Sequence, residues 1–147
     1  MKQADDESEH RFSDQGTVAP ALAGQPSPKL LGQIGERLAL QTLVQRGYRI
    51  LQCSFRCKLG EIDLVMEERG ELVFVEVKTR RGTAFGLPEE AVTWRKQRKL
   101  IAIAGYYRSL HGCEERSWRI DVVAVQFRRN GSLQEIRVYP HAVQAIE

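Results

Sequence analysis

The sequence predicts a mixed α/β domain in which helices flank a central β-sheet, in the order helix, three strands, helix, two strands. Two observations lead to this prediction. Two long segments carry apolar residues at helical spacing, whereas the segments between and after them are short and rich in Val, Ile, Phe and Tyr. Turn signals such as Glu67-Glu68-Arg69-Gly70-Glu71 separate the short segments. The chain therefore reads as one sheet-containing domain with helices packed on it.

The first predicted helix covers residues 30–46, with Leu31, Ile34 and Leu38 on one face. Gly47 ends it, because glycine accepts the backbone conformation that commonly follows a helix. Residues 48–55 form the first predicted strand, and the Arg56 to Gly60 region turns into the next one.

The same kinds of sequence signal predict the elements of the second half of the domain. Pro88 fits the first turn of a helix that runs to about Leu110. Residues 118–126 form a core strand. A turn at 128–131 leads into an edge strand over 133–139, which Pro140 is expected to close.

The first 28 residues differ from the rest of the chain. They carry two basic and five acidic residues together with three prolines, and few large apolar groups, which predicts a disordered tail. The single domain is then residues 29–147, with 20 basic and 14 acidic residues. This basic balance is compatible with binding nucleic acid without demonstrating it.

A hairpin over residues 60–78 is unusual because charges interrupt its apolar pattern. If it turns tightly at Arg69-Gly70, antiparallel register places Asp63 opposite Glu76 and Glu61 opposite Lys78. Opposed carboxylates are destabilising unless something neutralises them. Mg²⁺ suits such a pair, since it prefers oxygen ligands and is often held by one or two carboxylates together with water and phosphate. Lys78 would then stand beside the ion, able to orient or deprotonate an attacking water.

An ordinary explanation is also open: these four charges could form the solvated face of a hairpin, with Glu61 and Lys78 as an ion pair. The other face of the second strand carries Val73, Val75 and Val77. That favours a strand covered on both sides, where an unpartnered Glu76 would cost several kcal/mol.

Asp63 followed by Glu76-Val77-Lys78 resembles the signature of the PD-(D/E)XK nucleases, with Ile62 in the position of the proline. Together with residues 32–36 upstream, the pattern resembles the YraN-like family, which is related to archaeal Holliday-junction resolvases. The resemblance extends over residues 30–125, most of the chain.

The resemblance implies a restriction endonuclease-like core and an endonuclease that depends on Mg²⁺, or alternatively Mn²⁺. Its expected substrate is nucleic acid, in particular DNA, with branched DNA in repair or recombination as the form that the resolvase relatives suggest. It also implies a homodimer. It assigns Asp63, Glu76 and Glu36 to the metal, Lys78 to catalysis, Gln97 to the support of the site, and Lys96 and Lys99 to phosphate contacts.

Beyond Lys78, the segment 79–86 is basic and punctuated by glycine, and it contains Arg80 and Arg81. We expect a mobile loop near a phosphate backbone; a plain solvated connector is the alternative.

No apolar run approaches the roughly 20 residues that span a bilayer, so no membrane role is expected. The chain shows no secretory signal, and its three cysteines are an odd number, which together favour reduced thiols and a cytoplasmic location. Besides a nuclease, two functions stay open: a nucleic-acid-binding module of the same fold that lacks catalysis and works with partners, and a protein-interaction role.

Overall fold

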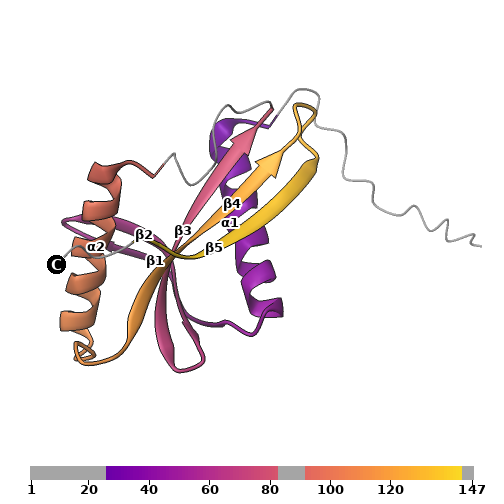
Figure 1. Cartoon of the computed structure of the whole chain (residues 1–147). Coiled ribbons are helices and arrows are strands. Elements are labelled where there is room, and N and C mark those ends of the chain that lie inside the picture. Colours follow the sequence, from indigo (N-terminus) through magenta and orange to yellow (C-terminus); the bar gives the residue numbers. More distant parts are fainter. Residues whose placement is uncertain (1–25, 83–91, 144–147) are drawn as a thin grey trace, which may run out of the picture.

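The computed structural model describes residues 26–82 and 92–143, and the predicted order of elements is confirmed (Figure 1). The elements are α1 (Pro28–Gln45), β1 (Arg49–Cys57), β2 (Gly60–Glu68), β3 (Glu71–Arg81), α2 (Trp94–Leu110), β4 (Trp118–Phe127) and β5 (Leu133–Val143). The tail prediction for residues 1–28 concerns mostly residues 1–25, which lie outside the described part. The predicted start of the second helix at Pro88 also lies outside it.

The strands of the described chain form one mixed sheet in the order β1-β2-β3-β4-β5. Neighbouring strands are antiparallel except for β3 and β4, which are parallel. A parallel pair needs a long crossover, and here it contains α2. Figure 1 shows α1 and α2 on either side of the sheet, so the predicted mixed sheet flanked by helices is confirmed.

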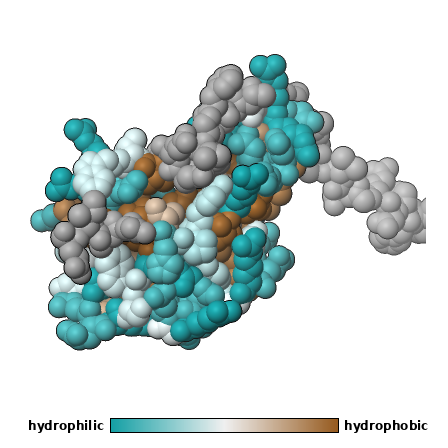
Figure 2. Space-filling model, in the orientation of Figure 1, coloured by the Kyte–Doolittle hydropathy of each residue, from teal (hydrophilic) through white to brown (hydrophobic). Residues whose placement is uncertain are grey.

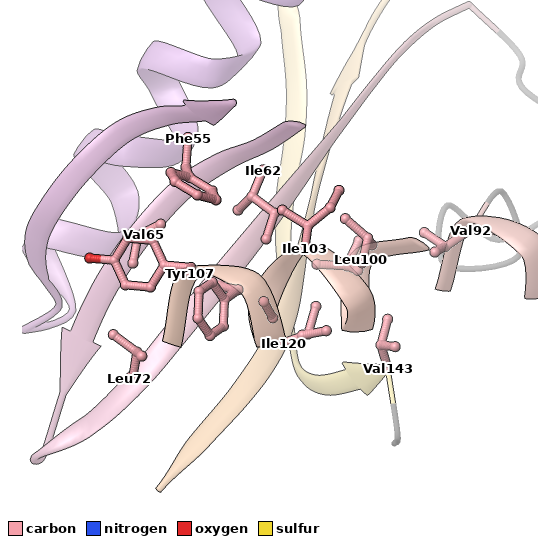
Figure 3. Packing of buried hydrophobic residues seen from close by; sticks show 13 residues of the cluster. Phe55, Ile62, Val65, Leu72, Val92, Leu100, Ile103, Tyr107, Ile120 and Val143 are labelled. Atoms are coloured by element: carbon pink, nitrogen blue, oxygen red, sulfur yellow. The ribbon is translucent and has the colours of Figure 1, made fainter. Parts of the chain in front are cut away.

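Each face of the sheet has its own hydrophobic cluster. Leu72 and Phe74 of β3 belong to the cluster beneath α2, whereas Val73 and Val75 belong to the cluster beneath α1. β3 is therefore buried on both faces, as predicted, and it is the strand that carries Glu76. Figure 3 shows the cluster of the α2 face, where Tyr107 and other side chains of α2 pack against β1 and β2.

Local sequence signals fix the ends of these elements. The Ser27 hydroxyl accepts a hydrogen bond from the Leu30 N–H (3.1 Å) and caps α1, and Pro28 occupies its first turn. Gly47, with φ of 95°, follows the end of this helix as predicted. The β2–β3 turn at Arg69 and Gly70 has positive φ at both residues (49° and 77°), as tight two-residue hairpins require.

Two boundaries differ from the prediction. Residues 79–81 are part of β3 and not of a loop, because they continue the parallel ladder with β4 up to the pair Arg81–Phe127. β5 also continues through Pro140 to Val143 instead of stopping before it. The β4–β5 register shifts between Ile120 and Val122, and His141, in the part of β5 opposite this shift, has φ of 52°. Proline has no N–H to donate, and at a bulge in an edge strand the ladder does not require one.

A buried charge network joins the N-terminal ends of the central strands. Asp121 of β4 is fully buried, and its carboxylate accepts hydrogen bonds from the Tyr48 hydroxyl (3.0 Å), from a backbone amide of β5 (3.0 Å) and from Arg119 (3.0 Å). The Arg119 guanidinium also pairs with Glu68 and with Glu71 (2.7 Å). Every charge in this network has a partner of opposite sign, and the network links four of the five strands described.

Within the described residues, neither helix is both long and apolar enough to cross a membrane. On the face seen in Figure 2, hydrophobic residues gather along the middle and hydrophilic residues cover most of the rest.

Candidate active site

The β2–β3 hairpin brings the predicted carboxylates together, although the predicted register ends one pair before them. The ladder follows that register from Glu68–Glu71 to Leu64–Val75 and ends there. Beyond this point the Asp63 carboxylate accepts a hydrogen bond from the backbone N–H of Val77 (2.7 Å). The prediction that Asp63 and Glu76 form a directly opposed pair was therefore wrong: the Asp63 side chain replaces the backbone ladder where the strands separate.

The backbone of β1 and β2 is irregular at the same level. The β1–β2 register is the same at Cys53–Leu64 and at Phe55–Ile62, but Ser54 between them has φ of 57°. Ile62 packs in the α2-side cluster, while Leu64 packs in the α1-side cluster, although residues two apart share a face in a regular strand. β2 therefore twists at Asp63.

Glu76 is almost completely buried (4% exposed) and has two lysine partners. The Nζ atoms of Lys96 and Lys78 lie 3.0 and 3.4 Å from its Oε1 atom. An unpaired carboxylate at this depth would cost several kcal/mol, so the two ammonium groups make its burial tolerable. Lys78 follows Glu76 by two positions on β3, and Lys96 reaches the site from the first turn of α2.

Negative charge nevertheless accumulates around Asp63. Its burial, followed by the negative charge of Glu76, raises the pKa of Asp63 from 3.8 to about 7, against the effect of the hydrogen bond from Val77. Carboxylates at Glu36 and Glu61 act in the same direction. A cation bound beside Asp63 would stabilise the ionised form of its carboxyl group, because a nearby positive charge favours that form.

Glu36 reaches this group from α1. Its burial and the negative charges of Glu61 and Glu76 raise the pKa of its carboxyl group, which also interacts with that of Asp63. The preceding residue explains how α1 comes so close to β3: a Cβ atom on Gly35 would lie 2.1 Å from the Thr79 hydroxyl. A glycine is thus needed where α1 crosses β3, next to the predicted metal ligand.

Glu61 lies at the margin of the site. It forms an ion pair with Arg56 of β1 (3.2 Å) and accepts a hydrogen bond from Ser54 (2.9 Å). The predicted pairing of Glu61 with Lys78 was wrong, since β2 and β3 no longer pair at that level and Glu61 turns to β1 instead.

The three residues of α2 that were predicted to belong to the site make different contacts. Lys96 contacts Glu76 directly, as described above. The Gln97 amide donates a hydrogen bond to the Val92 carbonyl (2.9 Å), so in this state it supports the start of its own helix. Lys99 lines a groove of about 430 Å³ beside the carboxylates, together with Lys96, Arg56, Cys57, Gly60, Glu61, Leu100 and Ile103.

Arg80 and Arg81 lie on β3, beyond Lys78. Alternation along the strand places Arg80 on the same face as Glu76 and Lys78. Arg81 donates a hydrogen bond to the backbone carbonyl of Pro26 (2.9 Å), just before α1. The assignment of both arginines to nucleic-acid binding stays a prediction.

The donor set fits a hard divalent cation. Among the described residues no group of three or more His, Cys, Asp or Glu side chains is gathered as a ready-made metal cage. Mg²⁺ does not require one, since one or two carboxylates with water and phosphate oxygens are its usual ligands. Asp63 and Glu76 would supply these oxygens, and burial followed by the negative charge of Glu76 raises the pKa of Asp63, which a nearby cation would lower again.

Sequence reasoning did not find the contact between Lys96 and Glu76. A signal was present, because acidic or neutral residues suit the first turn of a helix and α2 has basic residues there without an acidic one. Nor did it find the groove, since this depends on how α2 packs over the β1–β2 turn.

Comparison with known proteins places these residues in a family. The model of the uncharacterised protein family UPF0102 matches residues 35–125. A UPF0102 protein of Moorella thermoacetica is 46% identical over 73% of this chain and 89% of its own length. One of Caldanaerobacter subterraneus is 44% identical over 66% of this chain and 80% of its own length.

A solved structure, that of Pyrococcus furiosus SfsA in complex with Ca²⁺, is similar at 18% identity with a TM-score of 0.34. The similarity covers 80% of this chain and 65% of that protein.

Proposed function

We propose a nuclease function for this chain, which belongs to the uncharacterised protein family UPF0102. The reaction would be the hydrolysis of a nucleic-acid phosphodiester with the help of Mg²⁺ or Mn²⁺. The observation that carries the proposal is the gathering of Asp63, Glu76 and Lys78 at the point where β2 leaves β3, with carboxylates in excess.

Each residue has a role that its surroundings support. Asp63 and Glu76 would hold the cation, and Glu36 would complete its shell directly or through water. When bound, the cation polarises the phosphate and lowers the pKa of an attacking water. Lys78 places a positive charge beside Glu76, where it orients the water and offsets the charge that develops on the phosphate oxygens.

The surface next to the site suits a phosphate backbone. The groove beside it is lined by Arg56, Lys96 and Lys99, with Glu61 as its acidic residue. The groove volume of about 430 Å³ lies near the small end of the ~300–1,000 Å³ typical of ligand pockets. It therefore suits a short segment of a single nucleic-acid strand. DNA as the substrate, its branched form and a homodimeric protein are further proposals that come from the resolvase resemblance.

The test is a cleavage assay with labelled four-way junctions, flaps, duplexes and single strands of DNA and with RNA, in Mg²⁺, Mn²⁺ or chelator. The variants are Asp63→Asn and Lys78→Met. Glu135→Gln is a matched control, since it removes an exposed carboxylate on β5. We expect cleavage that requires the cation and falls by about 100-fold or more in the two site variants, a typical effect for a group that takes part in acid–base chemistry.

Cleavage that persists in Asp63→Asn and Lys78→Met would contradict the proposal. Binding that depends on salt but not on the cation, without cleavage, would favour the alternative of a non-catalytic module of the same fold.

A further inference from the structure

The contact of Lys96 with Glu76 is a feature of the site that the proposed reaction does not explain. Its Nζ atom lies closer to Glu76 Oε1 (3.0 Å) than that of Lys78 does (3.4 Å). The Glu76 side chain is 5% exposed, and that of Lys96 is 40% exposed. The pair thus joins a buried carboxylate to an ammonium group that solvent can reach.

The position of Lys96 in its helix is unfavourable by itself. Its backbone N–H donates to the hydroxyl of the N-cap Thr93 (3.2 Å), so Lys96 belongs to the first turn of α2. The N-terminus of a helix carries partial positive charge, so a cation there is disfavoured. The contact with Glu76 compensates for this cost, which indicates that the lysine is placed for Glu76 and not for the helix.

Lys96 and a divalent cation would compete for the Glu76 carboxylate. Glu76 is one of the two proposed ligands, and its Oε1 atom already faces two ammonium groups. Positive charges held a few ångströms apart near a protein surface repel each other, so a cation on Glu76 and the ammonium groups beside it oppose one another. Entry of a cation therefore favours a position of Lys96 away from Glu76.

The adjoining groove provides such a position. Lys96 lines it together with Lys99, which lies one turn further along α2. The Lys99 side chain crosses Gly60 so closely that a Cβ atom there would lie 2.7 Å from its Cε atom. A phosphate in this groove would meet Lys99 and could receive Lys96 when it leaves Glu76.

We infer that Lys96 neutralises Glu76 in the cation-free protein and moves to a substrate phosphate in the groove when a divalent cation binds. Lys96 is then a positioning residue that makes the cation and the nucleic acid bind cooperatively. The inference rests on the proposed function for the identity of the cation site and of the phosphate. It goes beyond that function by assigning an exchange of partners to one lysine.

The first measurement is calorimetric titration of Mn²⁺ into the nucleic-acid-free protein and its variants. We expect Lys96→Met to bind Mn²⁺ about 5-fold to 10-fold more tightly than the wild type, a gain of about 1–1.4 kcal/mol. Lys99→Met removes the same charge one turn away, without a contact to Glu76, and should leave the Mn²⁺ affinity nearly unchanged. Lys96→Arg keeps the positive charge and should behave like the wild type.

The second measurement is the binding of single-stranded DNA in Ca²⁺ or in chelator, followed by fluorescence anisotropy. The wild type should bind DNA more tightly in Ca²⁺ than in chelator, and Lys96→Met should lose most of this difference. Urea unfolding of each variant confirms that it is folded.

Unchanged or weaker Mn²⁺ binding by a folded Lys96→Met protein would overturn the inference, as would an equal gain in Lys99→Met. Such a result in a protein that still cleaves DNA would leave the proposed function intact. Tighter Mn²⁺ binding in Lys96→Met alone would support the exchange even if the wild type cleaves none of the substrates.

Discussion

Two groups of buried charges lie on the same sheet and differ in how they are balanced. The group around Asp121, at the N-terminal ends of β3 and β4, pairs each carboxylate with Arg119 or with hydrogen-bond donors. The group around Asp63, further along β3, sets several carboxylates against two lysines that both contact Glu76. Both are partly or fully removed from solvent, so burial alone does not distinguish them.

The difference is the reason for proposing a structural role for the first group and a functional role for the second. A complete set of partners offsets the desolvation of a charge and fixes the geometry of the strands around it. Around Asp63 the set is incomplete, and burial followed by the negative charge of Glu76 raises the pKa of Asp63 to about 7. Perturbed groups of this kind are frequent at functional sites, because the missing partner is supplied by the ligand.

Breaking the balanced group should give the largest loss of stability. Arg119→Met leaves Asp121, Glu68 and Glu71 without their shared cation, and removing one partner of a buried ion pair costs about 3–5 kcal/mol. We expect the free energy of unfolding to fall by that amount in urea denaturation. Arg137→Met, in an exposed pair with Glu135, should lose less than about 1 kcal/mol. Equal losses in both variants would contradict the comparison.

Removing the charge of Asp63 from the unbalanced group should raise the free energy of unfolding instead of lowering it. The folded protein holds a proton on Asp63 up to about pH 7, whereas the ordinary value is 3.8, so stability is lost as the pH rises through this window. Asp63→Asn cannot ionise but can still accept the Val77 hydrogen bond. At about pH 8 we expect this variant to be more stable than the wild type by about 2–4 kcal/mol, since one pKa unit is worth about 1.4 kcal/mol.

The gain should shrink as the pH falls and disappear below the ordinary value of 3.8, where the carboxyl group is protonated in the folded and unfolded protein alike. Chemical denaturation of both proteins across this pH range gives the result directly. A loss of stability in Asp63→Asn at alkaline pH would show that Asp63 is balanced after all.

A smaller effect is expected where α1 approaches the unbalanced group. Gly35→Ala places a methyl group against Thr79 of β3, and overpacking of this kind costs about 1–3 kcal/mol. Gly32→Ala is a matched control in the same helix, since no atom lies within 4 Å of the added group. Alanine is the better helix former, so this control should gain up to about 1 kcal/mol in thermal or urea unfolding. A gain in both variants would mean that α1 shifts freely on β3.

Much of the fold could be predicted from sequence because local signals agreed with one another. The turn at Arg69-Gly70 fixed the hairpin register, and the double-sided burial of β3 followed from Val73, Val75 and Phe74. Predictions based on the end of an element were less successful. β5 passes through Pro140 because it is an edge strand with a bulge, and residues 79–81 stay in β3 because β4 pairs with them.

The candidate site was predictable in its residue types and not in its contacts. Alternation indicated that Asp63, Glu76 and Lys78 belong to one hairpin. It could not show that the β2–β3 ladder ends before Asp63, where the Asp63 side chain accepts a hydrogen bond from the Val77 backbone. The contact between Lys96 and Glu76 depends on how α2 packs on the sheet, which the sequence of the helix does not specify.

The most direct test of the central claim is the effect of Mn²⁺ on the unfolding of the wild type and of Asp63→Asn at about pH 8. A ligand of the folded state at about ten times its dissociation constant stabilises it by about 1.4 kcal/mol. If the unbalanced carboxylates are a cation site, Mn²⁺ should stabilise the wild type and have little effect on Asp63→Asn. The absence of any stabilisation of the wild type, or equal stabilisation of both proteins, would contradict the claim.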